Sequence, residues 1–495
     1  MKNASPIRYT ALRSKGSHRI SVPSTFGGNA AHILKRHNEQ LQTVSGTKVT
    51  ESSPTAAGYD ISFESLEIRD IASALQDPEI IAIAPVMPTK VNGPALQKIS
   101  TPKQERSTKT KTDEASLLLE KNNLPKAANS FGFTGTSGRS GINRSGINGF
   151  YNALYNQGSA TWGVTTVKAE KSRYTGEGVS VAMLDTGIDN THEAFKDIDL
   201  EEIDFTGTGN GDDNGHGTHC AGTFFGKDVD GNRIGIAPGI DRAYIGKVIG
   251  PKGGDSHMLY QGMEWALNTG AKIIALSLDF DFQGFVSSLI KQGYQETAAT
   301  AIALDAYRQN LNLFDTLMDL IAVHKEDNGG AIIIAAAGNE DLSESQFLLG
   351  NEDLPNTYIA PALPGIAKDV ISVGAIQLST TQNTSKNLSL ASFSISLPDI
   401  VAPGTSILSA KLGGGLTKMS GTSMASPHVA GVAALYWEEV SKMGLRPGLR
   451  CEAVKDKIAS SATHQFFVDN IKDQTADVLA PASLRYGVGL VQAPQ

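Results

Sequence analysis

The chain has 495 residues, of which 40% are hydrophobic and 19% are charged, which is the composition of a globular protein and excludes a fibrous one. Its formal net charge of −8 gives no overall positive field for a phosphate backbone, so we expect no nucleic-acid partner. Cys220 and Cys451 are too few for a disulfide scaffold, and no apolar run approaches membrane-spanning length, so we expect no membrane partner.

Residues 1–97 predict a compact α+β unit. Two runs, at residues 7–11 and 59–63, alternate between apolar and polar side chains as strands with one apolar face do. Apolar residues then recur at helical spacing from Leu66 to Leu75, Asp77-Pro78 ends this helix, and residues 80–84 form another apolar strand.

Residues 98–156 have a different character. Lysine, serine and threonine are frequent there, and Ser-Gly-Ile-Asn occurs at Ser140 and again at Ser145. We interpret this segment as an exposed linker, because long loops without secondary structure are uncommon inside compact domains. The alternative is a surface excursion of the domain that follows.

Residues 157–495 predict a large α/β domain. Continuous apolar runs alternate with helical stretches, and these runs are VSVAMLD, AYIGKVIG, AKIIALSL, AIIIAAAGN and DVISVGAI. Such runs are typical of a mostly parallel sheet that helices cover on both faces. Functional residues of such sheets collect where strands end and in the loops that follow them.

A carboxylate and a histidine stand at such places. Asp185 ends the first of these runs, although an aspartate there is also common as a turn residue. His216 begins a helix between two glycines, and His219 follows one turn later, facing the interior. A metal pair is the alternative for the histidines, but Gly217 replaces the glutamate of zinc proteases and no third ligand is evident, so we predict no metal.

A serine and an amide complete the set. Ser423 lies at the start of a helix, where the helix dipole and free N–H groups stabilise negative charge, although an ordinary N-cap serine would also stand there. Asn339 ends the run AIIIAAAGN, and its uncharged amide can donate hydrogen bonds, as an oxyanion donor must.

These motifs resemble those of the subtilisin family of serine proteases, in the order Asp, His, Asn, Ser. The resemblance covers residues from about 157 to 495 and includes GMEWA, VAPG and YGVGL between and after the motifs. Residues 1–97, and Tyr59 to Lys90 above all, resemble the inhibitor-type, ferredoxin-like prodomain of that family. The chain's own prodomain is therefore an expected partner, beside a polypeptide substrate.

The resemblance implies a role for each group. Ser423 would attack the peptide carbonyl, His216 would take and return the proton, and Asp185 would orient the imidazole. Asn339 and the Ser423 N–H would bind the oxyanion. Substrate would lie as an added strand between one segment that contains Gly253 and Gly254 and another that contains Ser277 and Leu278. Ala337 and Gly338 would line the neighbouring side-chain pocket.

The sequence departs from the family in two places beside this cleft. Asp279 stands where many members have glycine, so its carboxylate would obstruct or select substrates. An insertion of about thirty residues follows, which is either a surface helix pair or a gate. Elsewhere, the loop at residues 227–234 has oxygens that suit calcium, although a solvated turn explains it as well, and we expect no other cofactor.

The sequence thus predicts a serine endopeptidase made as a self-processing zymogen, with its first cut between about residues 90 and 156. A peptide ligase or macrocyclase is the alternative, because an acyl-enzyme can also react with an amine. A mere binding module would be expected to lack one of the four groups. The N-terminus lacks a secretory apolar stretch, which predicts a cytoplasmic protein, with export as the alternative.

Overall fold

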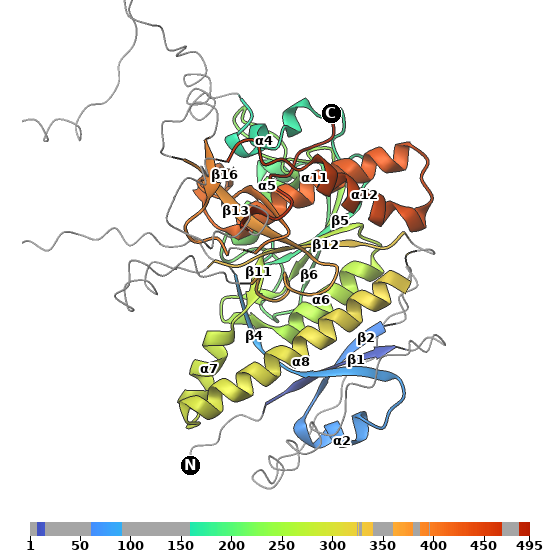
Figure 1. Cartoon of the computed structure of the whole chain (residues 1–495), viewed down its shortest axis with the longest axis vertical. Helices are drawn as coiled ribbons and strands as arrows, with labels where there is room; N and C mark the ends of the chain where they lie inside the picture. The colour runs from blue at the N-terminus through green and yellow to red at the C-terminus, as the bar shows by residue number, and fades with distance from the viewer. Residues whose placement is uncertain are drawn as a thin grey trace, which may run out of the picture.

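The computed structural model describes residues 7–14, 61–91, 159–323, 325, 329–339, 360–379, 387–395, 397–467 and 485–495. The predicted linker, residues 98–156, lies outside the described residues, and so does Tyr59 at the start of the second predicted strand. A small N-terminal unit lies against one side of a larger α/β body (Figure 1).

The larger body is built on one sheet, in the order β14-β13-β12-β10-β5-β7-β6, with β15 paired to β13. The strands are β5 (Val181–Asp185), β6 (Asp199–Asp204), β7 (Arg242–Lys247), β10 (Ile273–Leu276), β12 (Ile332–Ala336), β13 (Ile371–Leu378), β14 (Leu388–Leu390) and β15 (Ile400–Pro403). Every pair is parallel except β13 with β14. The mostly parallel sheet predicted from the apolar runs is therefore confirmed.

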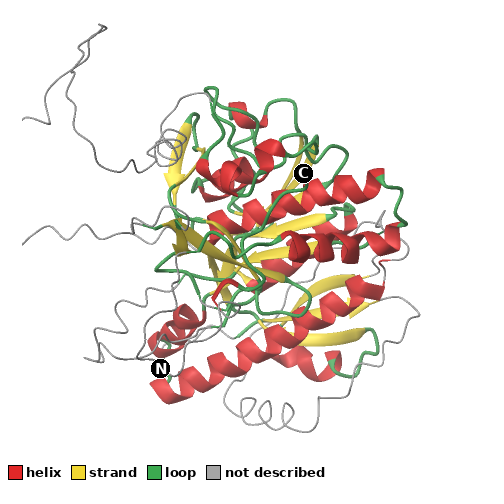
Figure 2. Cartoon of the chain, turned by 45° about the horizontal axis from the view of Figure 1, so that its top comes forward, coloured by secondary structure: helices red, strands yellow, loops and turns green. Residues whose placement is uncertain are grey.

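Helices cover both faces of the sheet, as Figure 2 shows. Met183 of β5 packs in a core cluster with α5 (His216–Phe225) and α11 (Thr422–Lys442), whereas its neighbour Leu184 packs in the opposite cluster with α6 (Ser256–Asn268) and α8 (Glu296–Val323). Because both neighbours are buried, the strand reads as a continuous apolar run. The smaller elements are α4 (Trp162–Thr166), η2 (Ala169–Lys171), η3 (Glu193–Phe195), α7 (Phe282–Lys291), β16 (Ile407–Ala410), β17 (Leu416–Met419) and α12 (Pro447–Ser461).

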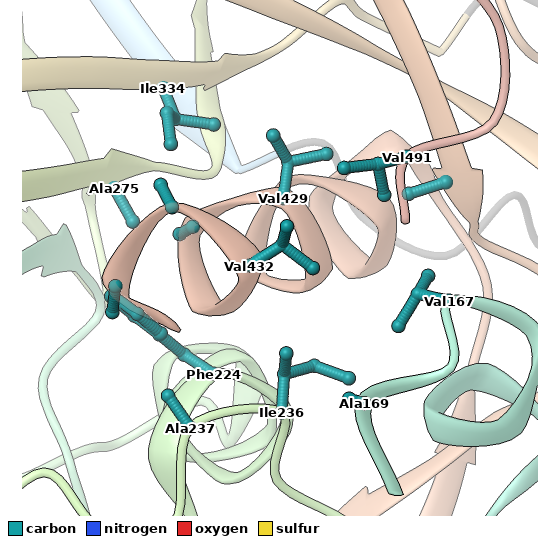
Figure 3. Packing of buried hydrophobic residues seen from close by; sticks show 14 of the residues in the cluster. Val167, Ala169, Phe224, Ile236, Ala237, Ala275, Ile334, Val429, Val432 and Val491 are labelled. Atoms are coloured by element: carbon teal, nitrogen blue, oxygen red, sulfur yellow. The ribbon is translucent and has the colours of Figure 1, made fainter. Parts of the chain in front are cut away.

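Helix α11 runs through the interior and is buried from Thr422 to Val440. Figure 3 shows Val429 and Val432 of this helix surrounded by apolar side chains from other elements. Close approach depends on Gly431, because a Cβ at that position would lie 2.4 Å from the Cβ of Ile236. Small residues in α11 thus allow the helix to pack closely against both the sheet and α5.

The N-terminal unit is an antiparallel sheet in the order β2-β1-β3, made of β1 (Tyr9–Ser14), β2 (Ile61–Leu66) and β3 (Ile80–Pro85). The predicted helix between β2 and β3 is shorter than expected, because η1 (Ile68–Asp70) leaves only α2 (Ile71–Ala74) as α-helix. The prediction of one apolar face was wrong for β1, where Thr10, Ala11 and Leu12 are all buried. Ala11 packs within the unit and Leu12 packs against the larger body.

This unit is docked on α6 and α8. The ring of Phe63 stacks on Tyr260 with 5.1 Å between ring centroids, and the Phe63 N–H donates to Glu264 at 3.0 Å. Asn310 of α8 donates to the Pro85 carbonyl at 2.8 Å. The second face of β1 is therefore buried because two helices of the larger body cover it. Whether the unit is ferredoxin-like stays a prediction.

A buried glutamate ties α11 to the segment that leads into β5. One oxygen of Glu438 accepts from the N–H groups of Thr175 at 2.8 Å, Gly176 at 2.7 Å and Glu177 at 3.1 Å, and the other lies 2.6 Å from Lys442 Nζ. Burial opposes the carboxylate, but these partners outweigh it and lower the pKa of Glu438.

Replacing Glu438 with glutamine should lower the free energy of unfolding by about 1–3 kcal/mol at pH 7, because the buried N–H groups lose a charged acceptor. A lowered folded-state pKa means that this stabilisation is present above the pKa of the unfolded chain and is lost as pH falls through the folded value. Denaturant unfolding of both proteins in a Ser423→Ala background should therefore show a difference that shrinks in acid. A difference independent of pH would contradict the assignment.

Candidate active site

Asp185 and His216 meet at the carboxyl end of the sheet. Asp185 is the last residue of β5 and His216 the first of α5, and Asp185 Oδ1 lies 2.7 Å from His216 Nδ1. Both side chains are buried. Burial opposes the charged imidazole, but the charge and hydrogen bond of Asp185, together with the nearby sulfur of Cys220, outweigh it and hold the pKa of His216 well above its ordinary value. Because Asp185 contacts Nδ1, the other ring nitrogen of His216, Nε2, faces away from Asp185.

Sequence reasoning missed Asp212, which joins the loops carrying these two residues. Its Oδ1 accepts from Thr186 Oγ1 at 2.9 Å and from the Gly215 N–H at 2.9 Å, next to Asp185 and His216 respectively. Its Oδ2 accepts from Thr218 through the N–H at 2.9 Å and the hydroxyl at 2.7 Å. An aspartate in the glycine-rich turn before a helix was the available signal, since such residues bind backbone N–H groups.

Ser423 is the second residue of α11, and the N-cap position belongs to Gly421, so the interpretation of Ser423 as an ordinary N-cap was wrong. Ser423 Oγ donates to the Ser277 carbonyl at 3.1 Å, and Ser277 Oγ donates to the Ser423 carbonyl at 3.1 Å. No described residue hydrogen-bonds to His216 Nε2. Proton transfer therefore requires the Ser423 side chain to turn toward that nitrogen.

Asn339 follows β12 and is oriented by the first turn of α11. Its Oδ1 accepts from the N–H of Thr422 at 2.9 Å and from the Thr422 hydroxyl at 2.8 Å. Gly338 N–H also donates to that hydroxyl, at 3.3 Å. The amide oxygen is thus occupied by α11, which directs the NH₂ group away from the helix. The structure therefore brings all four predicted catalytic residues to one region.

A segment of the N-terminal unit occupies the predicted substrate position. Strand β4 (Pro88–Val91) lies between β11 (Leu278–Phe280) and β9 (Gly253–Asp255), in a sheet of order β11-β4-β9-β8, where β8 is Ile249–Gly250. It is antiparallel to both neighbours, with Val91 opposite Leu278 and Thr89 opposite Gly254. The two segments predicted to bind substrate thus bind an extended strand of the chain itself.

Ala337 and Gly338, predicted to line a side-chain pocket, are buried, and their place in such a pocket stays a prediction. A Cβ on Gly338 would lie 3.3 Å from Asp279 Oδ2, and the Asp279 side chain is buried. Tyr307 of α8 lies near that carboxylate. Burial raises the pKa of Tyr307 to about 12, and the charge of Asp279 contributes to this rise. Asp279 therefore projects toward the Ala337-Gly338 wall instead of standing at the outer rim.

The inserted helices α7 and α8 border the cleft, as predicted. Asp281 is the N-cap of α7, where its side chain accepts from the Gly284 N–H at 3.1 Å. The Asp281 N–H donates to the Pro88 carbonyl of β4 at 2.8 Å. The insertion therefore contacts the strand in the cleft directly. Its action as a gate stays a prediction.

Among the residues that the structure describes, one buried group of metal-ligand atoms is present, made by Asp185, His216 and Cys220 within 4.8 Å of one another. Cys220 Sγ lies 3.9 Å from His216 Nδ1 and donates to the Ser423 carbonyl at 3.3 Å. Burial raises the pKa of the Cys220 thiol, so it remains protonated at neutral pH.

The fold and the meeting of these groups define a subtilisin-like serine endopeptidase, which acts on polypeptide substrates. The family model described as "Subtilase family" matches residues 176–489, and the chain belongs to this family. Subtilisin Savinase of Lederbergia lenta is 31% identical over 339 residues, covering 68% of this chain and 97% of the relative. Subtilisin DY of Bacillus licheniformis is 31% identical over 308 residues, covering 61% and 91%.

A mercurial should inactivate the enzyme through Cys220, because a metal bound to its sulfur would displace the ring of His216. Cys220→Ala should resist the reagent while keeping activity. Cys451 provides the matched control, since it is the other free, buried cysteine and lies on α12. Peptidase activity after titration with the mercurial gives the answer, and a Cys220→Ala enzyme that stays sensitive would exclude the mechanism.

The acid limb of the kcat/KM profile should lie above the ordinary histidine range. Catalysis needs neutral His216, so activity is lost as pH falls through its raised pKa. Asp185→Asn removes the charge that raises this pKa, so it should move the limb to lower pH and reduce kcat by roughly 10⁴-fold, the magnitude of the same substitution in a chymotrypsin-type triad. An unmoved limb in Asp185→Asn would show that His216 is not the titrating group.

Proposed function

We propose that the chain is the inhibited precursor of a serine endopeptidase, in which residues 1–97 block the peptidase domain at residues 157–495 until the enzyme cleaves the connection between them. The position of β4 between β11 and β9 carries the proposal. A strand in that place excludes substrate backbone from the same hydrogen-bonding groups.

The proposed reaction proceeds through an acyl-enzyme. Ser423 Oγ attacks the substrate carbonyl while His216 takes its proton, and His216 then protonates the leaving amine. Asp185 orients the imidazole and stabilises its charged form, in keeping with their 2.7 Å contact. The amide of Asn339 and the N–H of Ser423 stabilise the oxyanion, and water finally releases the acyl group.

The same geometry supports cleavage by the enzyme of its own chain. Val91 is opposite Leu278, and the residue before Leu278 is Ser277, whose carbonyl accepts from Ser423 Oγ. The chain therefore reaches the nucleophile immediately after Val91. We expect the first cut within a few residues of that point, at the beginning of the window from 90 to 156.

Hydrolysis is favoured over the ligase or macrocyclase alternative, because relatives whose names state an activity are proteases, such as the M-protease of Shouchella clausii, 31% identical over 339 residues. A calcium role for residues 227–234 stays a prediction. The N–H and carbonyl of Val229 and Asn232 bind each other at 3.0 and 2.8 Å, which is the pairing of a tight hairpin turn. The proposed reaction itself requires no cofactor.

No described helix has the length and apolar character needed to cross a membrane. The cytoplasmic location predicted from the N-terminus finds no support among the relatives, and export remains compatible with them. We propose export, the alternative of the two locations considered, and cell fractionation of the expressed chain would decide between them.

Self-processing is tested by intact mass. The wild type should convert to a large fragment that begins shortly after Val91, whereas Ser423→Ala should remain at full length because it lacks the nucleophile. Ser426→Ala is the matched control, because it removes a buried serine hydroxyl from the next turn of α11 and should process normally. Efficient conversion of purified Ser423→Ala would exclude self-cleavage, and an uncut wild type with full activity would show that residues 1–97 do not inhibit.

A further inference from the structure

Lys90 lies on β4, in the position that a substrate residue would occupy, so its contacts indicate which substrate side chains the cleft prefers. We infer that the cleft contains a subsite for a cationic side chain, built by Asp281, and that the enzyme prefers lysine or arginine in the substrate residue that takes the place of Lys90. The inference rests on the proposed function, in which β4 occupies the position of substrate.

The register and an ion pair support this subsite. Lys90 lies opposite Asp279 in the antiparallel pairing of β4 with β11, and residues directly opposite present their side chains on the same face. Lys90 Nζ lies 3.3 Å from Asp281 Oδ1. The Lys90 cation thus lies beside the carboxylate of Asp281 at the edge of the cleft.

The expected preference is modest because the pair is partly in water. The Lys90 side chain is 47% exposed and that of Asp281 is 26% exposed. Exposed pairs of this kind contribute little, and the positive N-terminus of α7 weakens the field of its own N-cap. We therefore expect lysine to be favoured over alanine by about threefold to fivefold in kcat/KM at low salt, and over glutamate by more, since a like charge is repelled.

The inserted helix supplies the recognising group. Asp281 is the N-cap of α7, and the N–H of Asp281 donates to the Pro88 carbonyl. The carboxylate of Asp281 is therefore fixed relative to the bound strand. Asparagine caps helices about as well as aspartate. Asp281→Asn therefore removes the charge of the subsite while it retains the helix and the backbone contact.

Peptide hydrolysis tests the preference. The activated enzyme would be given internally quenched peptides that copy residues 86–97, with lysine, arginine, alanine or glutamate in the place of Lys90. We expect lysine and arginine to exceed alanine and alanine to exceed glutamate, with the differences falling as salt rises. Asp281→Asn should compress this range when each kcat/KM is expressed relative to that of the alanine peptide with the same enzyme. Asp319→Asn, which removes a carboxylate paired with Lys368, is the matched control and should preserve the range.

A second measurement is independent of catalysis. In full-length Ser423→Ala, hydrogen exchange of the amides in β4 and β11 reports how firmly the strand is held. Lys90→Arg should leave exchange unchanged and Lys90→Glu should accelerate it, but by less in an Asp281→Asn background. Equal hydrolysis of all four peptides, or equal exchange in Lys90→Glu, overturns the subsite. Hydrolysis of none of the peptides would overturn the proposed peptidase instead, and the exchange experiment would still decide the subsite.

Discussion

Helix α11 is buried from Thr422 to Val440, and the active site depends on where that burial holds its first turn. Thr422 orients the amide of Asn339, while the backbone of Ser423 receives hydrogen bonds from Ser277 and Cys220. The nucleophile, the amide and one wall of the cleft are therefore fixed to a single helix. Moving this turn would require opening a close-packed core, so the geometry is held by packing energy from far outside the site.

Recognition in the cleft divides between backbone and side chains. The pairing of β4 with β11 and β9 uses groups that every residue except proline carries, so it accepts any extended segment. This explains how one cleft can hold the enzyme's own chain and also unrelated substrates. Docking of the N-terminal unit on α6 and α8 raises the local concentration of β4, which favours the intramolecular strand over a separate peptide.

The sequence was sufficient for five strands of the main sheet, β5, β7, β10, β12 and β13, because strands buried on both faces read as apolar runs. It also indicated the four catalytic residues, which stand where these strands end or where a helix begins. It did not indicate β6, whose alternate residues are exposed, or the short strands β14 and β15. It could not give contacts that depend on docking. The burial of Thr10 arises from a second body covering β1, and Asp212 acquires its partners only when two loops meet. The direction of Ser423 Oγ toward Ser277 is a side-chain torsion that no pattern encodes.

The departure at Asp279 fits the rest of the cleft because Gly338 has no side chain. Gly338 has a φ of 115°, which favours glycine, and a Cβ there would stand 2.6 Å from Ile395 as well as 3.3 Å from Asp279 Oδ2. The space that a side chain would fill is thus available to the carboxylate. Burying a carboxylate opposes folding, and a hydrophobic residue of similar volume would not carry that cost.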